Sequence, residues 1–252
     1  MLNTLSFEII LLIIGVGFLA GYINTMAGSG SLITLPLLIF IGLPANVANG
    51  TNRIAIFLQN VVGVGSFYQQ KQLNLKKDSL VAIPAIIGAI IGAYVAVDLD
   101  EEMLETVIGV IIVAMLVFML LKPKQFIKAE GEVKTKTPWY AYPVFLLIGF
   151  YGGFIQAGTG IFILIGLSLT AGYDLVKANA IKLLIVLIYT PFALYVFFIN
   201  GQVNLVAGLI LAAGNMGGAL LASRMAVKRG ARFVRYILLI IMIISAVKLL
   251  FF

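Results

Sequence analysis

Ten apolar stretches follow one another along this chain of 252 residues, separated by short polar or glycine-rich segments. Hydrophobic residues make up 62% of the sequence and charged residues only 11%, whereas a soluble domain carries roughly 25% charged residues. A soluble core could not bury this much apolar surface, but a bilayer requires apolar runs of this kind. The sequence therefore predicts an all-α polytopic membrane protein. The stretches are residues 7–24, 31–43, 53–69, 79–97, 103–121, 139–156, 161–172, 180–199, 203–223 and 233–251.

The second half of the chain repeats the first at one fixed offset of 130 residues. At this offset Ala27–Gly30 aligns with Ala157–Gly160, and Asn49 aligns with Asn179. Apolar chains match by chance at Leu, Ile, Val and Ala, so the coincidences of Gly, Asn and Gln carry the argument. We therefore predict two repeats of five segments each. The first covers residues 1–121, a basic linker covers 122–138 and the second repeat covers 139–252.

Loop charges predict how the two repeats lie in the membrane, because Lys and Arg are favoured on the cytoplasmic side. The loop at Lys71–Lys77 and the linker are basic, whereas the loop at Asp98–Glu102 between them is acidic. At the repeat offset this acidic loop aligns with the basic segment Lys228–Arg232. Equivalent loops would then lie on opposite faces, so the halves are inverted and both termini lie outside. Inverted repeats are typical of secondary transporters that bind substrate near the midplane.

Two apolar stretches, 31–43 and 161–172, are too short to cross a bilayer. A helix of their length rises about 20 Å, against a hydrocarbon core of about 30 Å, so they should begin inside the membrane. Each follows a Gly-X-Gly turn, Gly28–Gly30 or Gly158–Gly160, whose central Ser or Thr can cap the helix. The amide groups of two such helix starts, facing one another, would form an anion site. The alternative is that these glycines only let helices pack closely.

A polar cluster follows each short stretch, and Lys182 is its most deeply embedded cation, between Ile181 and Leu183. We expect Lys182 to meet an anionic substrate near the midplane, so that Lys182→Ala abolishes transport and leaves folding intact. Arg53 and Lys177 lie near helix ends, where such side chains also snorkel to the interface. The clusters comprise Asn46, Asn49, Thr51, Asn52 and Arg53 in the first half, and Asp174, Lys177, Asn179 and Lys182 in the second.

Three amides, Gln59, Asn60 and Gln156, are embedded in apolar sequence, where each requires a hydrogen-bond partner. We interpret Asn60 as a helix-to-helix contact and Gln156 as a candidate to line a substrate path. The chain has neither His nor Cys, which removes the usual metal and haem ligands. We expect no metal, no cofactor and no enzymatic activity. The Lys and Arg residues lie in short loops, which accounts for the net charge of +7 without nucleic acid.

These residues lie within two stretches, GYINTMAGSGSLITLPLLIFIGLPANVANGTNRIA and GGFIQAGTGIFILIGLSLTAGYDLVKANAIKLL. With these motifs the chain resembles the sulfite exporter TauE/SafE family of membrane permeases along nearly its whole length. The resemblance implies transport of a small sulfur-containing anion, such as sulfite, thiosulfate or a sulfonate, across a prokaryotic cytoplasmic (inner) membrane. Gly50-Thr51 keeps the family pattern, but Ala180-Ile181 does not, so the resemblance implies an asymmetric site.

Together these inferences predict an alternating-access transporter with an anion site between the repeats. The alternatives are an anion-selective channel and a membrane subunit that scaffolds a partner. The sequence does not select the substrate, the direction, the coupling ion or the oligomeric state, nor whether segments two and seven span fully or re-enter. The predicted substrate contacts are Gly28, Ser29, Gly30, Ser31, Asn49, Thr51, Asn52, Arg53, Gln156, Gly158, Thr159, Gly160, Asn179 and Lys182.

Overall fold

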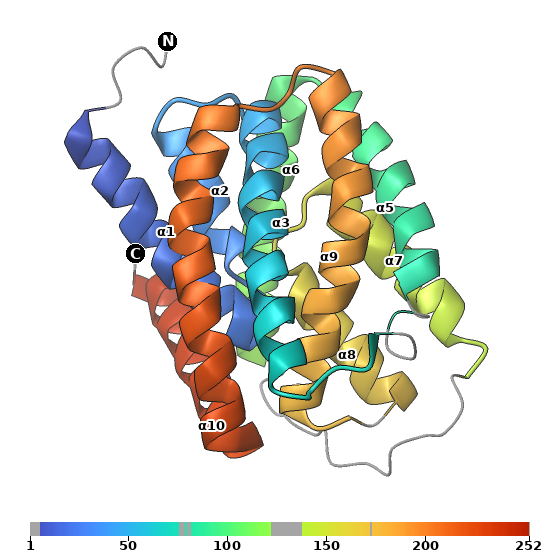
Figure 1. Cartoon of the computed structure of the whole chain (residues 1–252). Helices are drawn as coiled ribbons and strands as arrows, with labels where there is room; N and C mark the ends of the chain where they lie inside the picture. Colours follow the sequence, from blue (N-terminus) through green and yellow to red (C-terminus); the bar gives the residue numbers. More distant parts are fainter. Residues whose placement is uncertain (1–5, 76–78, 80–81, 122–137, 172, 252) are drawn as a thin grey trace.

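The computed structural model describes residues 6–75, 79, 82–121, 138–171 and 173–251. All regular structure within these ranges is helical, and the helices form one bundle (Figure 1). This confirms the predicted all-α class. The helices are α1 (Phe7–Ala27), α2 (Ser31–Phe40), α3 (Ala45–Gln69), α5 (Ala82–Val97), α6 (Glu101–Leu121), α7 (Ala141–Phe154), α8 (Thr159–Ala171), α9 (Leu175–Ile199) and α10 (Leu205–Phe251).

Three helical stretches of the described chain are long and apolar enough to cross a membrane by length and composition. They are Phe7–Ala27, Leu175–Ile199 and Leu205–Gly230. Large apolar side chains such as Phe40 and Trp139 remain 84% and 79% exposed on the outside of the bundle, where a bilayer would cover them. The fold is that of a multi-pass membrane protein.

The helix boundaries differ from the predicted segments in α10 and at the starts of α3 and α9. The last two segments both lie within α10, which breaks at Gly230, where φ is 74° and ψ is −177°. Helices α3 and α9 each begin several residues earlier than predicted. Most cluster residues in their first turns are buried inside the bundle, so low hydropathy there does not mark a loop. The buried ones are Asn49, Thr51, Asn52 and Arg53 in α3 and Asn179 and Lys182 in α9, whereas Asn46 and Lys177 are half-buried and Asp174 is exposed.

The short helices α2 and α8 return towards opposite ends of the bundle. In Figure 1, α1 descends to the middle of the bundle and α2 runs back towards the end at which α1 begins. Helix α8 runs to the other end, where Leu167 packs in one core cluster with Phe67, near the end of α3. Helix α2 ends at Phe40 and is joined by a short connection to the start of α3 at Ala45, whereas α8 lies near the end of α3.

Two pairs of helices pack closely through glycines on both partners. In α1, a Cβ atom added to Gly21 would lie 2.7 Å from Cα of Asn215 in α10. In α7, a Cβ atom added to Gly149 would lie 2.6 Å from Cα of Ala85 in α5. Small residues allow backbones to approach in this way inside membranes. In each pair, one helix comes from the first half of the chain and its partner from the second.

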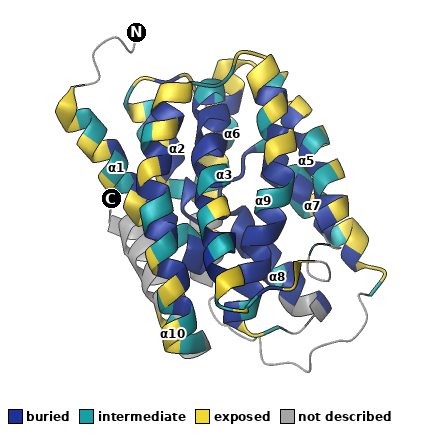
Figure 2. Cartoon of the chain, in the orientation of Figure 1, coloured by how far each residue is buried: buried dark blue, intermediate teal, exposed yellow. Residues whose placement is uncertain are grey.

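Helices α3 and α9 occupy the centre of the bundle, with 25 residues each. Most of their residues are buried, and Figure 2 shows buried positions concentrated on the inner faces of the helices. The two helices run in opposite directions, because Gly50 near the start of α3 approaches Phe197 near the end of α9. Several polar side chains on these helices, among them Asn60 of α3 and Lys182 of α9, are buried in the interior of the bundle.

Candidate functional site

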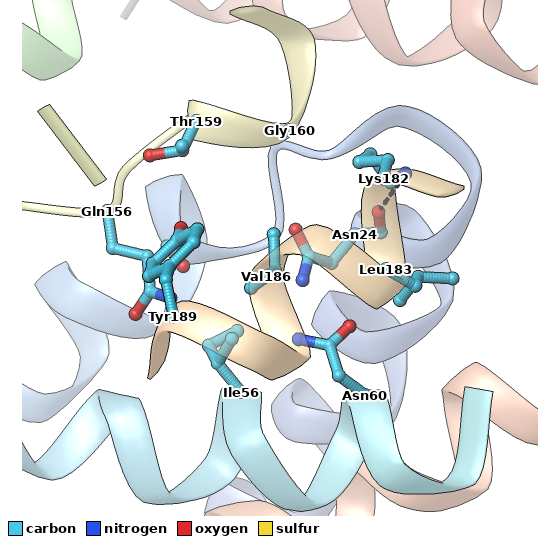
Figure 3. Close-up of a pocket in the computed structure, with 11 residues that line it drawn as sticks. Asn24, Ile56, Asn60, Gln156, Thr159, Gly160, Lys182, Leu183, Val186 and Tyr189 are labelled. Atoms are coloured by element: carbon cyan, nitrogen blue, oxygen red, sulfur yellow. Dashed lines mark hydrogen bonds between the residues drawn. The ribbon is translucent and has the colours of Figure 1, made fainter. Parts of the chain in front are cut away.

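A narrow pocket lies between α3, α9 and the two Gly-X-Gly turns (Figure 3). Water centres can occupy only about 10 Å³ of it, about the least volume that holds one water molecule. No Asp or Glu is among the described residues that line it. The lining residues are Asn24, Ser31, Ile56, Asn60, Gln156, Thr159, Gly160, Lys182, Leu183, Val186 and Tyr189.

The two glycine turns meet directly beside this pocket. A Cβ atom added to Gly160 would lie 2.9 Å from the carbonyl oxygen of Gly28, and closer still to its Cα. Gly28 and Gly158 have positive φ values of 79° and 72°, which glycine adopts without strain. The backbones of Gly28 and Gly160 thus fill the space between the turns, and the pocket opens to one side of their contact.

The Ser and Thr of these turns do not cap the helices that follow, contrary to the expectation from sequence. The N-cap of α2 is Gly30, without a side-chain cap, and its amide donates to Oδ1 of Asn24 at 3.4 Å. Both Ser29 Oγ and Thr159 Oγ1 are buried without a hydrogen-bond partner. The Thr159 hydroxyl faces the Tyr189 hydroxyl, but neither has a partner at hydrogen-bond geometry, so both are available to a ligand in the pocket.

Lys182 lies 2% exposed on α9 and donates three hydrogen bonds. Its Nζ donates to the carbonyl oxygens of Asn24 and Thr25, each at 2.9 Å, and to Oδ1 of Asn179 at 2.6 Å. An ammonium group has three donors, so all are used here. The carbonyls belong to the last turn of α1, where a cation also offsets the helix dipole. Lys182→Ala would leave these acceptors without their donor, so unaltered folding no longer follows from the geometry.

Arg53 binds carbonyl oxygens at the end of α7, as Lys182 does at the end of α1. It is fully buried on α3, and its guanidinium donates to the carbonyl oxygens of Gly152 at 3.0 Å and Gly153 at 2.6 Å. Its Cζ lies 4.4 Å from the ring centroid of Phe197. Asn49 donates to the carbonyl oxygen of Phe154 at 2.8 Å. The alternative that Arg53 snorkels to the interface is wrong, because its charge is held in the interior by the end of α7.

Two other predicted site residues bind protein groups near the start of α3. Asn52 donates to Ser31 Oγ at 3.1 Å and accepts from Thr34 Oγ1 at 2.7 Å, which joins α3 to α2. Thr51 accepts from the backbone amide of Asn204 at 2.8 Å, just before α10. Neither Asn52 nor Thr51 is among the residues that line the pocket.

Gln156 closes α7 in an unusual backbone conformation and faces the pocket. Its φ is 66°, in the left-handed region that residues other than glycine seldom adopt. Its Nε2 lies 3.2 Å from Thr190 Oγ1, while its Oε1 has no hydrogen-bond partner. A strained residue at a pocket wall often marks a functional position.

Asn60 lies on the opposite wall, on α3, and the prediction that it bonds another helix is wrong. It is 1% exposed, and neither Nδ2 nor Oδ1 has a hydrogen-bond partner. Gln59, its neighbour, does make such a contact, because it accepts from Asn215 on α10 at 3.3 Å.

The structure thus brings together part of the predicted site. Ser31, Gln156, Thr159, Gly160 and Lys182 line the pocket, with the remaining glycine-turn residues beside it in sequence. Asn49, Thr51, Asn52, Arg53 and Asn179 do not line it. Sequence reasoning missed Asn24 and the apolar wall, and it missed Tyr189, which lies two turns beyond Lys182 on α9. That spacing on one helix face was the available signal for Tyr189.

Comparison with known families decides the classification. The profile of the family described as Sulfite exporter TauE/SafE matches residues 13–249, which is nearly the whole chain. The chain belongs to the sulfite exporter TauE/SafE family. The resemblance noted in the glycine turns is thereby confirmed over almost all of the sequence.

Relatives of this TauE/SafE chain bear the names of transporters. A Sinorhizobium protein named probable membrane transporter protein ORF9 is 30% identical, over 99% of this chain and 95% of its own length. Probable membrane transporter protein YfcA of Escherichia coli K12 is 27% identical, over 94% and 87%. A probable membrane transporter protein of Haemophilus influenzae is 24% identical, over 98% and 96%.

Proposed function

We propose that this chain transports a small sulfur-containing anion, such as sulfite, thiosulfate or a sulfonate, across a prokaryotic cytoplasmic membrane by alternating access. The observation that carries this proposal is the pocket beside the meeting point of the two Gly-X-Gly turns. Its polar walls come from both halves of the chain, with Ser31 and Asn60 from the first and Gln156, Thr159 and Lys182 from the second. Relative movement of the halves would therefore open and close the site.

Exchanged contacts support two inverted repeats as the moving parts. Lys182 of the second half binds the end of α1, and Arg53 of the first half binds the end of α7. The glycine-mediated pairs of α1 with α10, and of α5 with α7, are exchanged in the same way. The opposite directions of α2 and α8 agree with re-entrant hairpins that enter from opposite faces (Figure 1). Combined with loop charge, this arrangement favours both termini on the extracytoplasmic side.

The chemistry of the walls favours an anion. Lys182 supplies positive charge, and Thr159 supplies a hydroxyl without a protein partner. No carboxylate among the described lining residues would repel a negative ligand. Hydrogen-bond donors aimed at negative oxygens in a water-poor site are stronger than in water.

The small volume of the pocket favours a carrier over a channel. A channel requires a continuous water path, whereas the space here holds about one water molecule. A sulfur oxyanion has several non-hydrogen atoms, so the helices must separate before it enters. Such gated entry is the step that limits a carrier to one substrate per cycle.

The test is uptake of sulfite, thiosulfate and methanesulfonate into proteoliposomes that contain the purified protein, compared with empty liposomes. Thr159→Val keeps the shape of the side chain and removes one unpartnered hydroxyl, so uptake at low substrate should fall about fivefold to tenfold. Thr170→Val is the matched control on the same helix, because the Thr170 hydroxyl donates to Gly166 away from the pocket. Absence of uptake of every sulfur anion by the folded wild type would refute the proposal.

A further inference from the structure

The side chain of Asn60 is the most isolated polar group in the pocket. It projects from α3 into the pocket near Leu183 and Val186 (Figure 3). It is 1% exposed, and both its amide nitrogen and its amide oxygen lack a hydrogen-bond partner in the described structure. Burying an amide without partners costs free energy. A ligand that forms hydrogen bonds with both amide atoms would recover this free energy on binding.

The sequence repeat explains why Asn60 has no partner. At the offset of 130 residues Asn60 aligns with Thr190, and Met26 aligns with Gln156. In the second half, Gln156 and Thr190 are hydrogen-bonded to each other. In the first half, the position equivalent to Gln156 holds methionine, which offers Asn60 no comparable partner. The two walls are therefore chemically different: Gln156 has a partner for its amide nitrogen, whereas Asn60 has none for either amide atom.

An amide makes a requirement that a hydroxyl does not. Its nitrogen donates to an anionic oxygen, but its oxygen only accepts and therefore needs a donor on the ligand. Exchanging the two amide atoms by rotation does not alter this requirement, since neither has a partner. A fully deprotonated oxyanion such as sulfate has no donor, and its charge would repel the amide oxygen.

We propose that the substrate is a monoanion that carries an O–H or N–H donor beside its anionic oxygens, as hydrogen sulfite does, and that Asn60 recognises both. This inference rests on the proposed transport of a sulfur-containing anion and narrows its substrate class. It also means that the proton crosses on the substrate. No carboxylate relay is then needed, in keeping with a pocket whose described lining contains no Asp or Glu.

Other groups at the pocket do not supply this donor. Lys182 already uses its three donors on Asn24, Thr25 and Asn179. Tyr189, the other titratable group in the lining, comes from α9 as Lys182 does, and no hydrogen bond joins it to Asn60. Arg53, on the same helix as Asn60, is bound to the end of α7. None of these groups donates to Asn60 in the described structure, so a ligand that carries its own donor would satisfy the amide oxygen.

Sulfamate and methanesulfonate form a matched pair of probes for this proposal. Both are monoanions near neutral pH with the same number of non-hydrogen atoms, but sulfamate has N–H donors where methanesulfonate has a methyl group. Titration calorimetry on the purified wild type, at one fixed pH, should show about tenfold tighter binding of sulfamate. A constant pH keeps the ionisation of Lys182 and Tyr189 the same for both probes.

Asn60→Leu provides the decisive variant, because leucine has nearly the shape of asparagine and no polar atoms. The affinity ratio should fall to about one, while the melting temperature rises through removal of an unsatisfied buried amide. Asn215→Leu, which removes a buried amide on α10 outside the pocket, should leave the ratio near tenfold.

Equal affinities in the wild type, or a ratio that survives Asn60→Leu, would overturn the inference and leave the proposed function standing. Failure of sulfite, thiosulfate, methanesulfonate and sulfamate all to bind the folded wild type would instead overturn the proposed function, and this inference with it.

Discussion

Replacing Gly160 with alanine tests whether the contact between the two broken helices shapes the site. Gly160 lies in the first turn of α8 and has no positive φ, so alanine meets no backbone strain there. Only space opposes it. The new Cβ would lie 2.9 Å from the carbonyl oxygen and 3.1 Å from the carbonyl carbon of Gly28, where contacts shorter than 3.4 Å are rare. These are backbone atoms, which cannot turn aside as a flexible side chain can.

The expected loss of stability follows from two opposing terms. Overpacking of this kind costs about 1–3 kcal/mol, and alanine returns up to about 1 kcal/mol of helix propensity. Because the new Cβ meets three backbone atoms of Gly28 within 3.1 Å, the upper half of the overpacking range applies. About 2–3 kcal/mol less about 1 kcal/mol leaves a net loss of about 1–2 kcal/mol, which lowers the melting temperature of a chain of this size by about 2–8 °C. Because Gly160 lines the pocket, the same displacement should weaken binding of the proposed anionic substrate.

Thermal unfolding of the detergent-solubilised protein, followed by uptake into proteoliposomes, measures both effects. Gly65→Ala is the control, since a Cβ atom at Gly65 in α3 meets nothing within 4 Å. That variant should equal or slightly exceed the wild type in stability and transport normally. If Gly160→Ala also unfolds at the wild-type temperature and transports at the wild-type rate, the close contact with Gly28 does not constrain the site.

Three further variants test how the broken helices are held. Lys182→Met should lower the melting temperature, because three acceptors lose their donor at a cost of about 1 kcal/mol each. Removal of a buried charge offsets part of this cost. An unchanged melting temperature in a thermal unfolding experiment would contradict this prediction. Arg53→Lys should be less stable than the wild type but more stable than Arg53→Leu. Lysine keeps the positive charge but lacks the forked guanidinium group that binds two carbonyl oxygens. The order of the three melting temperatures tests this prediction. Gly21→Ala should lower the melting temperature by about 2–12 °C relative to Gly15→Ala in the same helix. A Cβ atom at Gly21 would meet the backbone of α10, whereas one at Gly15 would meet nothing within 4 Å. Equal melting temperatures would refute close packing at Gly21.

Much of the fold could be predicted from sequence, because hydropathy and glycine placement are local signals. The apolar stretches lie in helices, and the predicted breaks coincide with the end of α1 at Ala27 and the start of α8 at Thr159. The starts of α3 and α9 were less predictable. Hydropathy falls where polar residues cluster, whether they face a loop or a buried polar interior, and here most of them are buried.

The site was harder to predict, because its contacts join residues far apart in the chain. Lys182 was correctly singled out as a buried cation, but its bonds to Asn24 and Thr25 cross between halves of the protein and leave no local pattern. Asn60 and Gln156 both stand in apolar sequence. Only three-dimensional packing shows that the amide nitrogen of Gln156 has a partner, whereas Asn60 has none. Residue type thus indicated which groups require partners, and the fold determined which of them receive one.

The exchange of cations between the halves has a consequence for how this protein is made. The carbonyl groups at the end of α1 emerge early in synthesis, but Lys182, which binds them, lies on α9 and emerges much later. Until then these carbonyls must be hydrated or bound by other groups, because the bilayer interior offers them no partner. We therefore expect the first half to enter the membrane incomplete, and the end of α1 to reach its final position only when the second half has been inserted beside it.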